Sequence, residues 1–189
     1  METMTLAEEL LYTVDDWENF PDNGNRYEII EGELIVSTAP RFIHQLLIAR
    51  LVEILRNYIK QNPIGEVLPT PGVIFSKTDG AIPDLIFISS ERIKQFLLDD
   101  RIQGAPELVV EIMSPGKQNM ERDRVTKLKL YSRFAVKEYW IVDPMSKQIE
   151  VFRSTSHGLR LAEKLNETET LVSPLFPNFS LQIIKLFHD

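Results

Sequence analysis

The chain has 189 residues, 21 basic and 28 acidic side chains, a net charge of −7 and no cysteine. Its length suits one domain, residues 1–189, and its 43% hydrophobic and 26% charged residues are typical of a soluble globular protein. These numbers exclude disulfides, zinc–thiolate sites and thiol nucleophiles, and no apolar run approaches the roughly 18 residues of a membrane-spanning helix. Because the acidic start of the chain does not resemble a secretory signal, we expect a cytoplasmic protein that does not enter a membrane.

The spacing of apolar residues predicts two helices and a β-hairpin in the first third of the chain. In chain order these are an N-terminal helix over residues 5–17, a hairpin with strands 26–30 and 33–37, and a long helix over residues 42–61.

After the long helix, the pattern changes to short strands separated by turns that contain Pro, Gly or Asp. The predicted strands are 66–68, 73–76, 82–88, 107–113, 138–142, 148–153 and 159–165, with helices over 90–96 and 121–134, an irregular connection from 97 to 104 and a strand-like tail over 174–187. Since a helix connects strand 107–113 to strand 138–142, we expect these two strands to be parallel. We therefore expect an α/β fold.

Two acidic residues stand at the ends of apolar runs that predict buried strands. Asp84 precedes the run 85–88, and Glu111 follows the run 108–110. A carboxylate at such a place binds a metal, pairs with a cation or takes part in chemistry, because burial of an unpaired charge is unfavourable. Two such acids on adjacent strands can hold Mg²⁺, or Mn²⁺ in its place, since these ions prefer oxygen ligands.

Hydrolysis of a phosphodiester also needs a positive charge near the attacking water and the phosphoryl oxygens. In the usual arrangement a lysine two residues after the second carboxylate supplies this charge, but Met113 holds that position here. Lys127, on the helix predicted to follow the strand, is long enough to supply the charge instead. A solvated position on the helix surface is the alternative for Lys127.

The segment 117–137 carries seven basic and two acidic residues, a net charge of +5 within an acidic protein. Such a patch is compatible with nucleic-acid binding, and a solvated cationic helix face explains it equally well.

Six motifs follow one another in a fixed order along the chain. They are Tyr27–Leu34, His44, Pro83–Leu85, Gly104–Pro115, the group Arg122, Asp123, Lys127 and Tyr131, and Glu138–Pro144. This ordered set, which extends from about residue 11 to residue 187, strongly resembles the Uma-two family of predicted bacterial restriction endonucleases. That family is in turn similar to the PD-(D/E)XK nuclease superfamily.

The resemblance implies a restriction-endonuclease-like fold, a mixed central sheet flanked by helices, and a Mg²⁺-dependent endonuclease that hydrolyses DNA. Asp84 and Glu111 would be the metal ligands, and Lys127 would match a family lysine that has moved from the strand to the helix. It also implies a homodimer, because cleavage of both DNA strands needs two sites, and no organic cofactor.

The remaining polar residues of these motifs are each compatible with more than one role. Glu31 and Glu33 match an acidic element of the family and could complete the metal shell or position a water. Glu28, on the same strand, could have the same roles. His44 could contact phosphate or carry a proton. For each of these residues a solvent-exposed or locally hydrogen-bonded side chain is the alternative.

Two other functions are compatible with the sequence. A non-catalytic DNA- or partner-binding module could retain a nuclease fold, and the overall acidity of the chain favours it. An assembly role is the third. The choice between DNA and RNA, between duplex and single strand, and among biological roles stays open.

Overall fold

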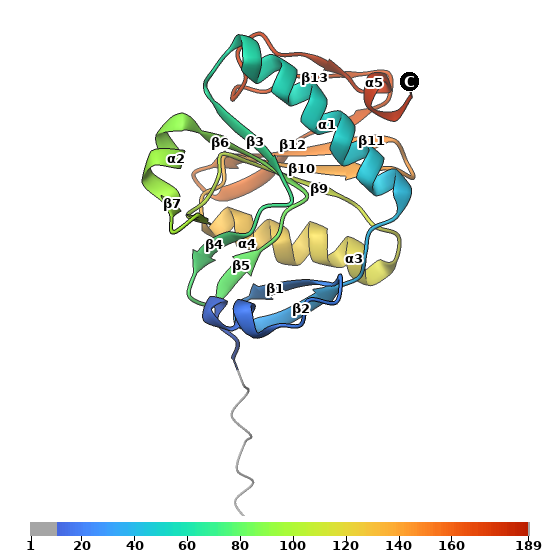
Figure 1. Cartoon of the computed structure of the whole chain (residues 1–189). Helices are drawn as coiled ribbons and strands as arrows, with labels where there is room; N and C mark the ends of the chain where they lie inside the picture. The colour runs from blue at the N-terminus through green and yellow to red at the C-terminus, as the bar shows by residue number, and fades with distance from the viewer. Residues whose placement is uncertain (1–10, 189) are drawn as a thin grey trace, which may run out of the picture.

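A mixed six-stranded sheet lies at the centre of the molecule, with helices on both faces (Figure 1). The computed structural model describes residues 11–188, apart from the side chains of Lys117 and Gln118. The strands of this sheet lie in the order β12 (Gly158–Asn166), β11 (Gln148–Thr155), β10 (Glu138–Asp143), β9 (Leu108–Ile112), β6 (Leu85–Ser89) and β3 (Gly65–Pro69). As predicted, β9 and β10 are parallel, and the other neighbours pair antiparallel. The predicted mixed α/β fold is confirmed.

A second six-stranded sheet covers the lower part of the molecule in Figure 1. Its order is β2 (Glu33–Ser37), β1 (Arg26–Ile30), β5 (Asp79–Ala81), β4 (Val73–Ser76), β8 (Arg101–Gln103) and β7 (Leu97–Leu98). The sequence predicted the hairpin of β1 and β2 and the strand β4. It did not predict β5, β7 and β8, because strands of two or three residues are too short to show an alternating pattern.

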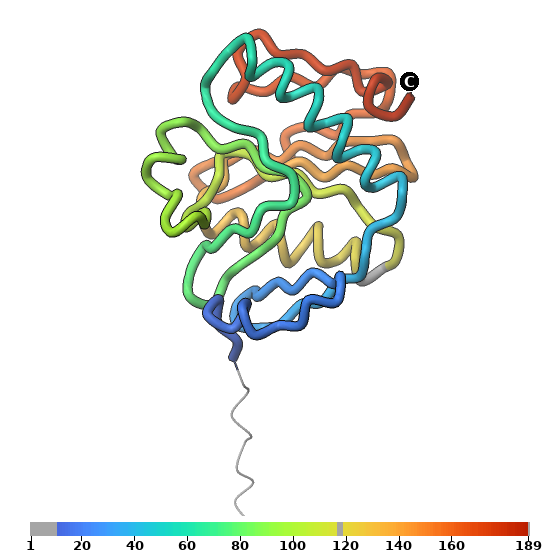
Figure 2. Tube along the Cα trace, viewed as in Figure 1, coloured from blue at the N-terminus to red at the C-terminus, as the bar shows by residue number. Residues whose placement is uncertain are grey.

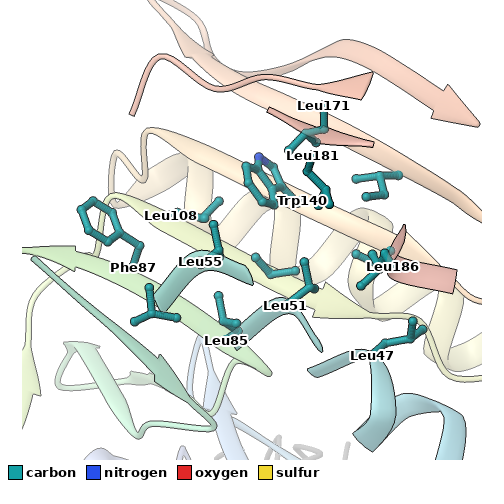
Figure 3. Packing of buried hydrophobic residues seen from close by; sticks show 14 of the residues in the cluster. Leu47, Leu51, Leu55, Leu85, Phe87, Leu108, Trp140, Leu171, Leu181 and Leu186 are labelled. Carbon is teal, nitrogen blue, oxygen red and sulfur yellow. The ribbon is translucent and has the colours of Figure 1, made fainter. Parts of the chain in front are cut away.

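Helix α1 (Phe42–Gln61) covers one face of the central sheet (Figures 1 and 3). Leu47, Leu51 and Leu55 recur at four-residue spacing, which places them on one side of the helix, where they pack with Leu85 and Trp140 of the sheet. The C-terminal segment completes this layer. It runs beside α1, as the chain trace shows (Figure 2), and consists of β13 (Thr170–Leu171), β14 (Leu181–Gln182) and α5 (Ile184–Phe187).

A helical segment of three parts covers the opposite face of the central sheet (Figure 1). The parts are α3 (Lys117–Glu121), the π-helix η2 (Arg122–Lys127) and α4 (Leu128–Arg133). Leu130 and Tyr131 of α4 pack with Val109, Met113 and Tyr139 of the sheet. The predicted helix 121–134 is therefore present, but it begins four residues earlier and contains a π-helical turn.

Strand β9 directs Glu111 toward this second layer, because successive side chains of a strand point to opposite faces. Val110 and Ile112 pack on the side of α1, whereas Val109 and Met113 pack on the side of α4. Glu111 therefore shares the α4 side with Met113. A lysine at position 113 would face the same side, and the methionine there is buried in the apolar cluster instead.

The predicted N-terminal helix over residues 5–17 lies partly outside the described residues. Residues 11–13 are not helical, and Val14–Asn19 form a short 3₁₀-helix, η1. The backbone N–H groups of Tyr12 and Val14 donate to the carbonyls of Gly32 and Lys77, both at 2.9 Å, so this segment pairs with the second sheet. Long-range backbone pairing of this kind is not visible in a helical spacing pattern.

The predicted helix over residues 90–96 is confirmed as α2 (Ser90–Phe96). The side chain of Ser89 caps this helix by accepting a hydrogen bond from the backbone N–H of Arg92. In the part of the chain that the structure describes, no helix has both the length and the apolar character required to span a bilayer.

Candidate active site

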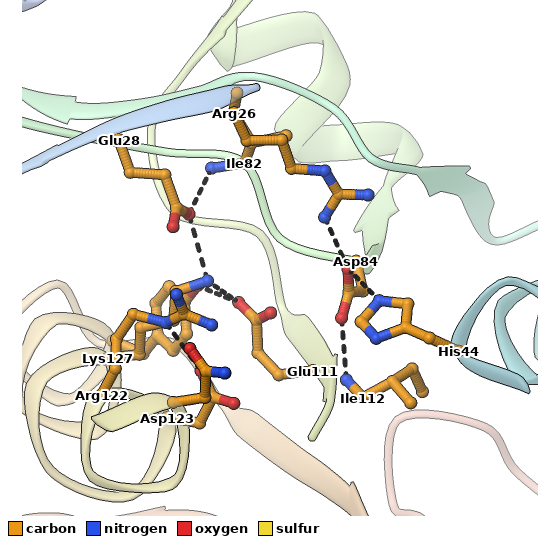
Figure 4. Close-up of polar contacts among 12 residues, drawn as sticks. Arg26, Glu28, His44, Ile82, Asp84, Glu111, Ile112, Arg122, Asp123 and Lys127 are labelled. Carbon is orange, nitrogen blue, oxygen red and sulfur yellow. Dashed lines mark hydrogen bonds and ion pairs between the residues drawn. The ribbon is translucent and has the colours of Figure 1, made fainter. Parts of the chain in front are cut away.

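Asp84 lies immediately before β6 and is held by three neighbours (Figure 4). Its Oδ1 accepts a hydrogen bond from Arg26 at 2.7 Å, and its Oδ2 accepts one from the backbone N–H of Ile112 at 2.8 Å. The third neighbour is His44, whose Nε2 is 2.9 Å from Oδ1. Burial alone would raise the pKa of Asp84, but His44, Lys127 and Arg26 outweigh it and lower the pKa to about 2. Asp84 is therefore ionised at neutral pH.

Glu111 faces Asp84 from the neighbouring strand, because Leu85 pairs with Val110 in the β6–β9 ladder. Its Oε1 accepts from Lys127 Nζ at 2.9 Å and from the Tyr131 hydroxyl at 2.7 Å. Burial is the main reason why the pKa of Glu111 rises to about 8; the nearby acids add to the rise, and Lys127 opposes it.

Lys127 Nζ lies between two carboxylates, 2.9 Å from Glu111 and 3.1 Å from Glu28 (Figure 4). Burial would lower the pKa of this ammonium, but Glu111, Glu28 and Asp123 outweigh it and raise the pKa above its ordinary value. Lys127 therefore stays protonated. It is a hydrogen-bond donor and a positive charge, and it cannot act as the base that takes a proton from water.

Glu28 is the acid of the β-hairpin that reaches the site. It is buried on β1, and its Oε1 accepts from the Ile82 N–H at 2.9 Å and forms an ion pair with Lys127. Arg26 is two residues earlier on the same strand and therefore faces the same side. Strand β1 thus supplies one acid and one cation to the site.

The π-helix η2 adds a fourth acid and, besides Lys127, a further cation. Asp123 and Lys127 are its two buried residues, four positions apart, and Asp123 Oδ1 accepts from Arg122 Nε at 3.3 Å. Burial raises the pKa of Asp123, against the effect of Lys127 and Arg122. π-helical turns often occur at functional sites, and here the turn points both charged side chains inward.

His44 is buried on the first turn of α1, and its Nδ1 has no hydrogen-bond partner in the described part of the chain. Its Nε2 is 2.9 Å from Asp84 Oδ1, which pairs the imidazole with that carboxylate. A buried polar group without a hydrogen bond is uncommon in a native protein and calls for an explanation. A bound molecule in the adjacent cavity would supply the missing partner.

All of these side chains line one cavity of about 330 Å³. Its acids form what we call the acid cluster: Glu28, Asp84, Glu111 and Asp123. The cations that line the cavity are Arg26, Arg41, Arg122 and Lys127. Strongly perturbed carboxylates together with fixed cations in one cavity are typical of an active site.

Mg²⁺ is the metal that the family resemblance implies for this cavity. Among the described residues, no three His, Asp or Glu side chains converge to hold a metal by themselves. Mg²⁺ does not require three, since it usually takes one or two carboxylates, several waters and a substrate phosphate. Both hydrogen bonds of Glu111 involve Oε1, which leaves Oε2 available, and three other acids lie close enough to raise the pKa of Glu111, which an added cation would oppose. The donor set of Asp84 and Glu111 therefore fits Mg²⁺.

A family model decides the relationship of this chain to known proteins. The model of Uma2, described as "Putative restriction endonuclease", matches residues 13–183. The chain belongs to the Uma2 family. This membership supports a nuclease function acting on nucleic acid.

A solved structure agrees with the fold. It is described as "a putative nuclease belonging to DUF820 from Anabaena variabilis ATCC 29413", and it matches with a TM-score of 0.75 at 19% identity over 93% of this chain and 97% of that chain. At this identity the likeness concerns the fold alone. A search of curated proteins found no match.

The structure brings together four of the six site residues that the sequence of this Uma2 protein suggested. Asp84, Glu111, Lys127 and His44 line the cavity, whereas Glu31 and Glu33 do not. Glu31 and Gly32 are the central residues of the hairpin turn, with φ values of 55° and 81°, and Glu31 points outward to pair with Arg133. Glu33 is exposed on the edge strand β2.

Three further residues of the cavity had no role in the sequence-based hypothesis. They are Arg26, Arg122 and Asp123. Arg26 could have been found from the two-residue spacing with Glu28, which places both on one face of β1. Arg122 and Asp123 belong to the ordered motif set, but the direction of the Asp123 side chain depends on the π-helical turn.

Proposed function

We propose that this Uma2 protein is a Mg²⁺-dependent endonuclease that hydrolyses DNA phosphodiester bonds. One observation carries the proposal: Asp84, Glu111 and Lys127 come from three separate elements and line one cavity. Family membership supports the same conclusion independently. A buried group of ion pairs that served stability alone would not need a cavity beside it.

Asp84 and Glu111 would hold the cation. A divalent cation supplies neutralisation of the phosphoryl oxygens and a lower pKa of the attacking water. Arg26 and Arg122, whose partly exposed side chains line the cavity, would neutralise the substrate phosphate.

Lys127 would orient the attacking water and stabilise the charge that develops on the phosphoryl oxygens. Its ammonium is fixed in place by Glu28 and Glu111, so it needs no reorganisation during the reaction. Tyr131 in turn fixes Glu111; burial and the adjacent carboxylate raise the pKa of its hydroxyl well above the usual range, so it stays a donor.

His44 would act on the leaving group. In the reaction the water oxygen bonds to phosphorus and releases one proton to solvent, the bond from phosphorus to one sugar oxygen breaks, and that sugar oxygen takes a proton. The buried imidazole of His44 lies at the cavity next to Asp84, and its Nδ1, which has no partner among the described residues, could donate this proton or bind the phosphate.

Cleavage of DNA with and without Mg²⁺ tests the proposal. We expect cleavage by the wild type in Mg²⁺ or Mn²⁺, none in EDTA, and none by Asp84→Asn or Glu111→Gln. Undiminished cleavage by a folded Asp84→Asn variant would refute the assignment. DNA binding without either cleavage or Mg²⁺ binding by calorimetry would favour a non-catalytic binding module instead.

A homodimer, a cytoplasmic location and one domain over residues 1–189 stay predictions. Light scattering after size exclusion tests the first, with twice the chain mass as the expected result.

A further inference from the structure

We infer that Tyr139 is a positioning residue: its hydroxyl holds the π-helical turn of η2 in the form that directs Arg122 and Asp123 into the cavity. Tyr139 itself does not line the cavity. The consequence for catalysis rests on the proposed function, whereas the anchoring of the turn does not. Three observations support the inference: the partner of a buried hydroxyl, the rigid surroundings of its ring, and the geometry of a π-helical turn.

The hydroxyl of Tyr139 connects the central sheet to the backbone of η2. Tyr139 lies on β10 and is 0% exposed. A buried hydroxyl is normally hydrogen-bonded, and this one donates to the backbone carbonyl of Asp123 at 3.0 Å. A carbonyl oxygen has two lone pairs, so it can accept this bond in addition to one within the helix. Packing alone would be served equally well by a phenylalanine, so the connection depends on the hydroxyl.

The ring that carries this hydroxyl is held in place on several sides. Strand β10 is paired on both edges, with Tyr139 opposite Val109 of β9 and Phe152 of β11. The ring contacts Tyr131 in a T-shaped arrangement, with centroids 5.0 Å apart, and Phe152 with centroids 6.0 Å apart. A side chain packed in this way cannot follow η2 if the helix shifts. The hydroxyl is therefore a fixed point to which the backbone of Asp123 is tied.

A π-helical turn contains one residue more than an α-helical turn. Because an α-helix rotates by about 100° per residue, loss of the π turn would rotate the residues before it by about 100° relative to those after it. The residues after the turn are held, since Tyr131 packs in the apolar core and shares Glu111 Oε1 with Lys127. The rotation would therefore move Arg122 and Asp123.

The placement of Arg122 and Asp123 thus depends on the π turn, and that of Lys127 does not. Arg122 Nε donates to Asp123 Oδ1 at 3.3 Å, and both residues line the cavity (Figure 4). Without the π turn this ion pair would leave the cavity, while Lys127 and Glu111 would keep their contact. Since Arg122 is proposed to neutralise the substrate phosphate, loss of the Tyr139 hydroxyl should weaken substrate binding more than the chemical step.

Hydrogen exchange of the backbone amides in EDTA tests the anchor without any measurement of activity. Tyr139→Phe keeps the ring and removes only the hydroxyl. We expect exchange in η2 to become roughly two- to tenfold faster, which is the factor that corresponds to the loss of one neutral hydrogen bond, while the amides of α1 keep their protection. Unchanged exchange in η2, or an equal increase in η2 and α1, would overturn the inference.

Tyr131→Phe is the matched control, because it removes another fully buried hydroxyl from the same group of rings. The hydroxyl of Tyr131 binds the side chain of Glu111 and not the backbone of η2. Exchange in η2 should therefore stay within about twofold of the wild-type rate. An equal increase in the two variants would mean that loss of any buried hydroxyl loosens this layer, and would overturn the role of Tyr139.

Cleavage of DNA in Mg²⁺ tests the consequence for the substrate. For Tyr139→Phe we expect a KM at least roughly twofold higher and an unchanged kcat, because fewer molecules hold Arg122 in the cavity. A fall in kcat at unchanged KM would overturn the inference, since it would place the effect on Lys127 and Glu111. Faster exchange in η2 without cleavage by either protein would support the anchor and refute the proposed function. Cleavage by both proteins with equal exchange and equal KM would overturn the inference alone.

Discussion

Replacement of Glu111 by Gln should make the metal-free protein more stable at alkaline pH, although it removes a proposed metal ligand. The reason is the pKa of Glu111, which is about 8 in the folded protein against 4.5 without the fold. A raised pKa means that the folded state binds the proton more tightly, so the contribution of this group to stability is fully present below 4.5 and is lost as the pH rises through 8.

By the linkage relation, these two pKa values mean that the contribution of Glu111 to the free energy of unfolding falls by about 3 kcal/mol between about pH 5 and about pH 8. Glu111→Gln has no proton to release, and its carbonyl oxygen can still accept from Lys127 and Tyr131. The variant should therefore lack this part of the pH dependence. Its stability relative to wild type should rise by about 3 kcal/mol between the two pH values.

Asp84→Asn is the matched control with the opposite sign. Because the pKa of Asp84 is lowered from 3.8 to about 2, its contribution is present above 3.8 and is lost as the pH falls through 2. Asp84→Asn should therefore destabilise the protein at neutral pH by about 2 kcal/mol, with little change between pH 5 and pH 8.

Urea unfolding in EDTA, followed by the fluorescence of the fully buried Trp140, measures both variants. If Glu111→Gln loses stability as steeply as wild type between the two pH values, Glu111 does not hold a proton in the folded state. The electrostatic account of the acid cluster would then be refuted.

Three other predictions follow from the same cavity. Lys127→Met should abolish cleavage. It should also destabilise the protein by roughly 3–5 kcal/mol in alkaline solution, and by less in acid, because Glu28 and Glu111 lose their cation. An equal loss of stability in alkaline and acidic solution would contradict the second expectation. Adding Met113→Lys to that variant should restore part of the cleavage, since position 113 shares a face with Glu111; no recovery in a folded double variant would contradict it. Glu28→Gln should lower kcat at least roughly tenfold, while Glu33→Gln, exposed on the same hairpin, should leave it within about twofold; the reverse order would return the role to Glu33.

Regular elements with a long apolar pattern were predictable from the sequence. The boundaries of β1, β2, α1 and α2 agree with the prediction, and so does the parallel pairing of β9 and β10. The second sheet was not predictable, because β5, β7 and β8 are held by pairing with distant strands rather than by their own composition.

The candidate site was partly predictable for a similar reason. Asp84 and Glu111 stand out because a carboxylate contrasts with the apolar run beside it. The choice of Glu28 over Glu31 was not predictable, since it depends on two positive φ values in the hairpin turn that direct Glu31 outward. Tertiary geometry of this kind leaves little trace in a local pattern.

The division of the site between a sheet and a helix has a consequence for its behaviour on heating. The acids Asp84 and Glu111 belong to the central sheet, and Lys127 belongs to a separate helical layer that packs on it. Local opening can release such a layer while the rest of the protein stays folded. Activity should then disappear in a reversible step at a temperature below the melting temperature of the sheet. The position of the lysine on a helix would thus set an upper temperature limit for activity that is lower than the temperature of global unfolding.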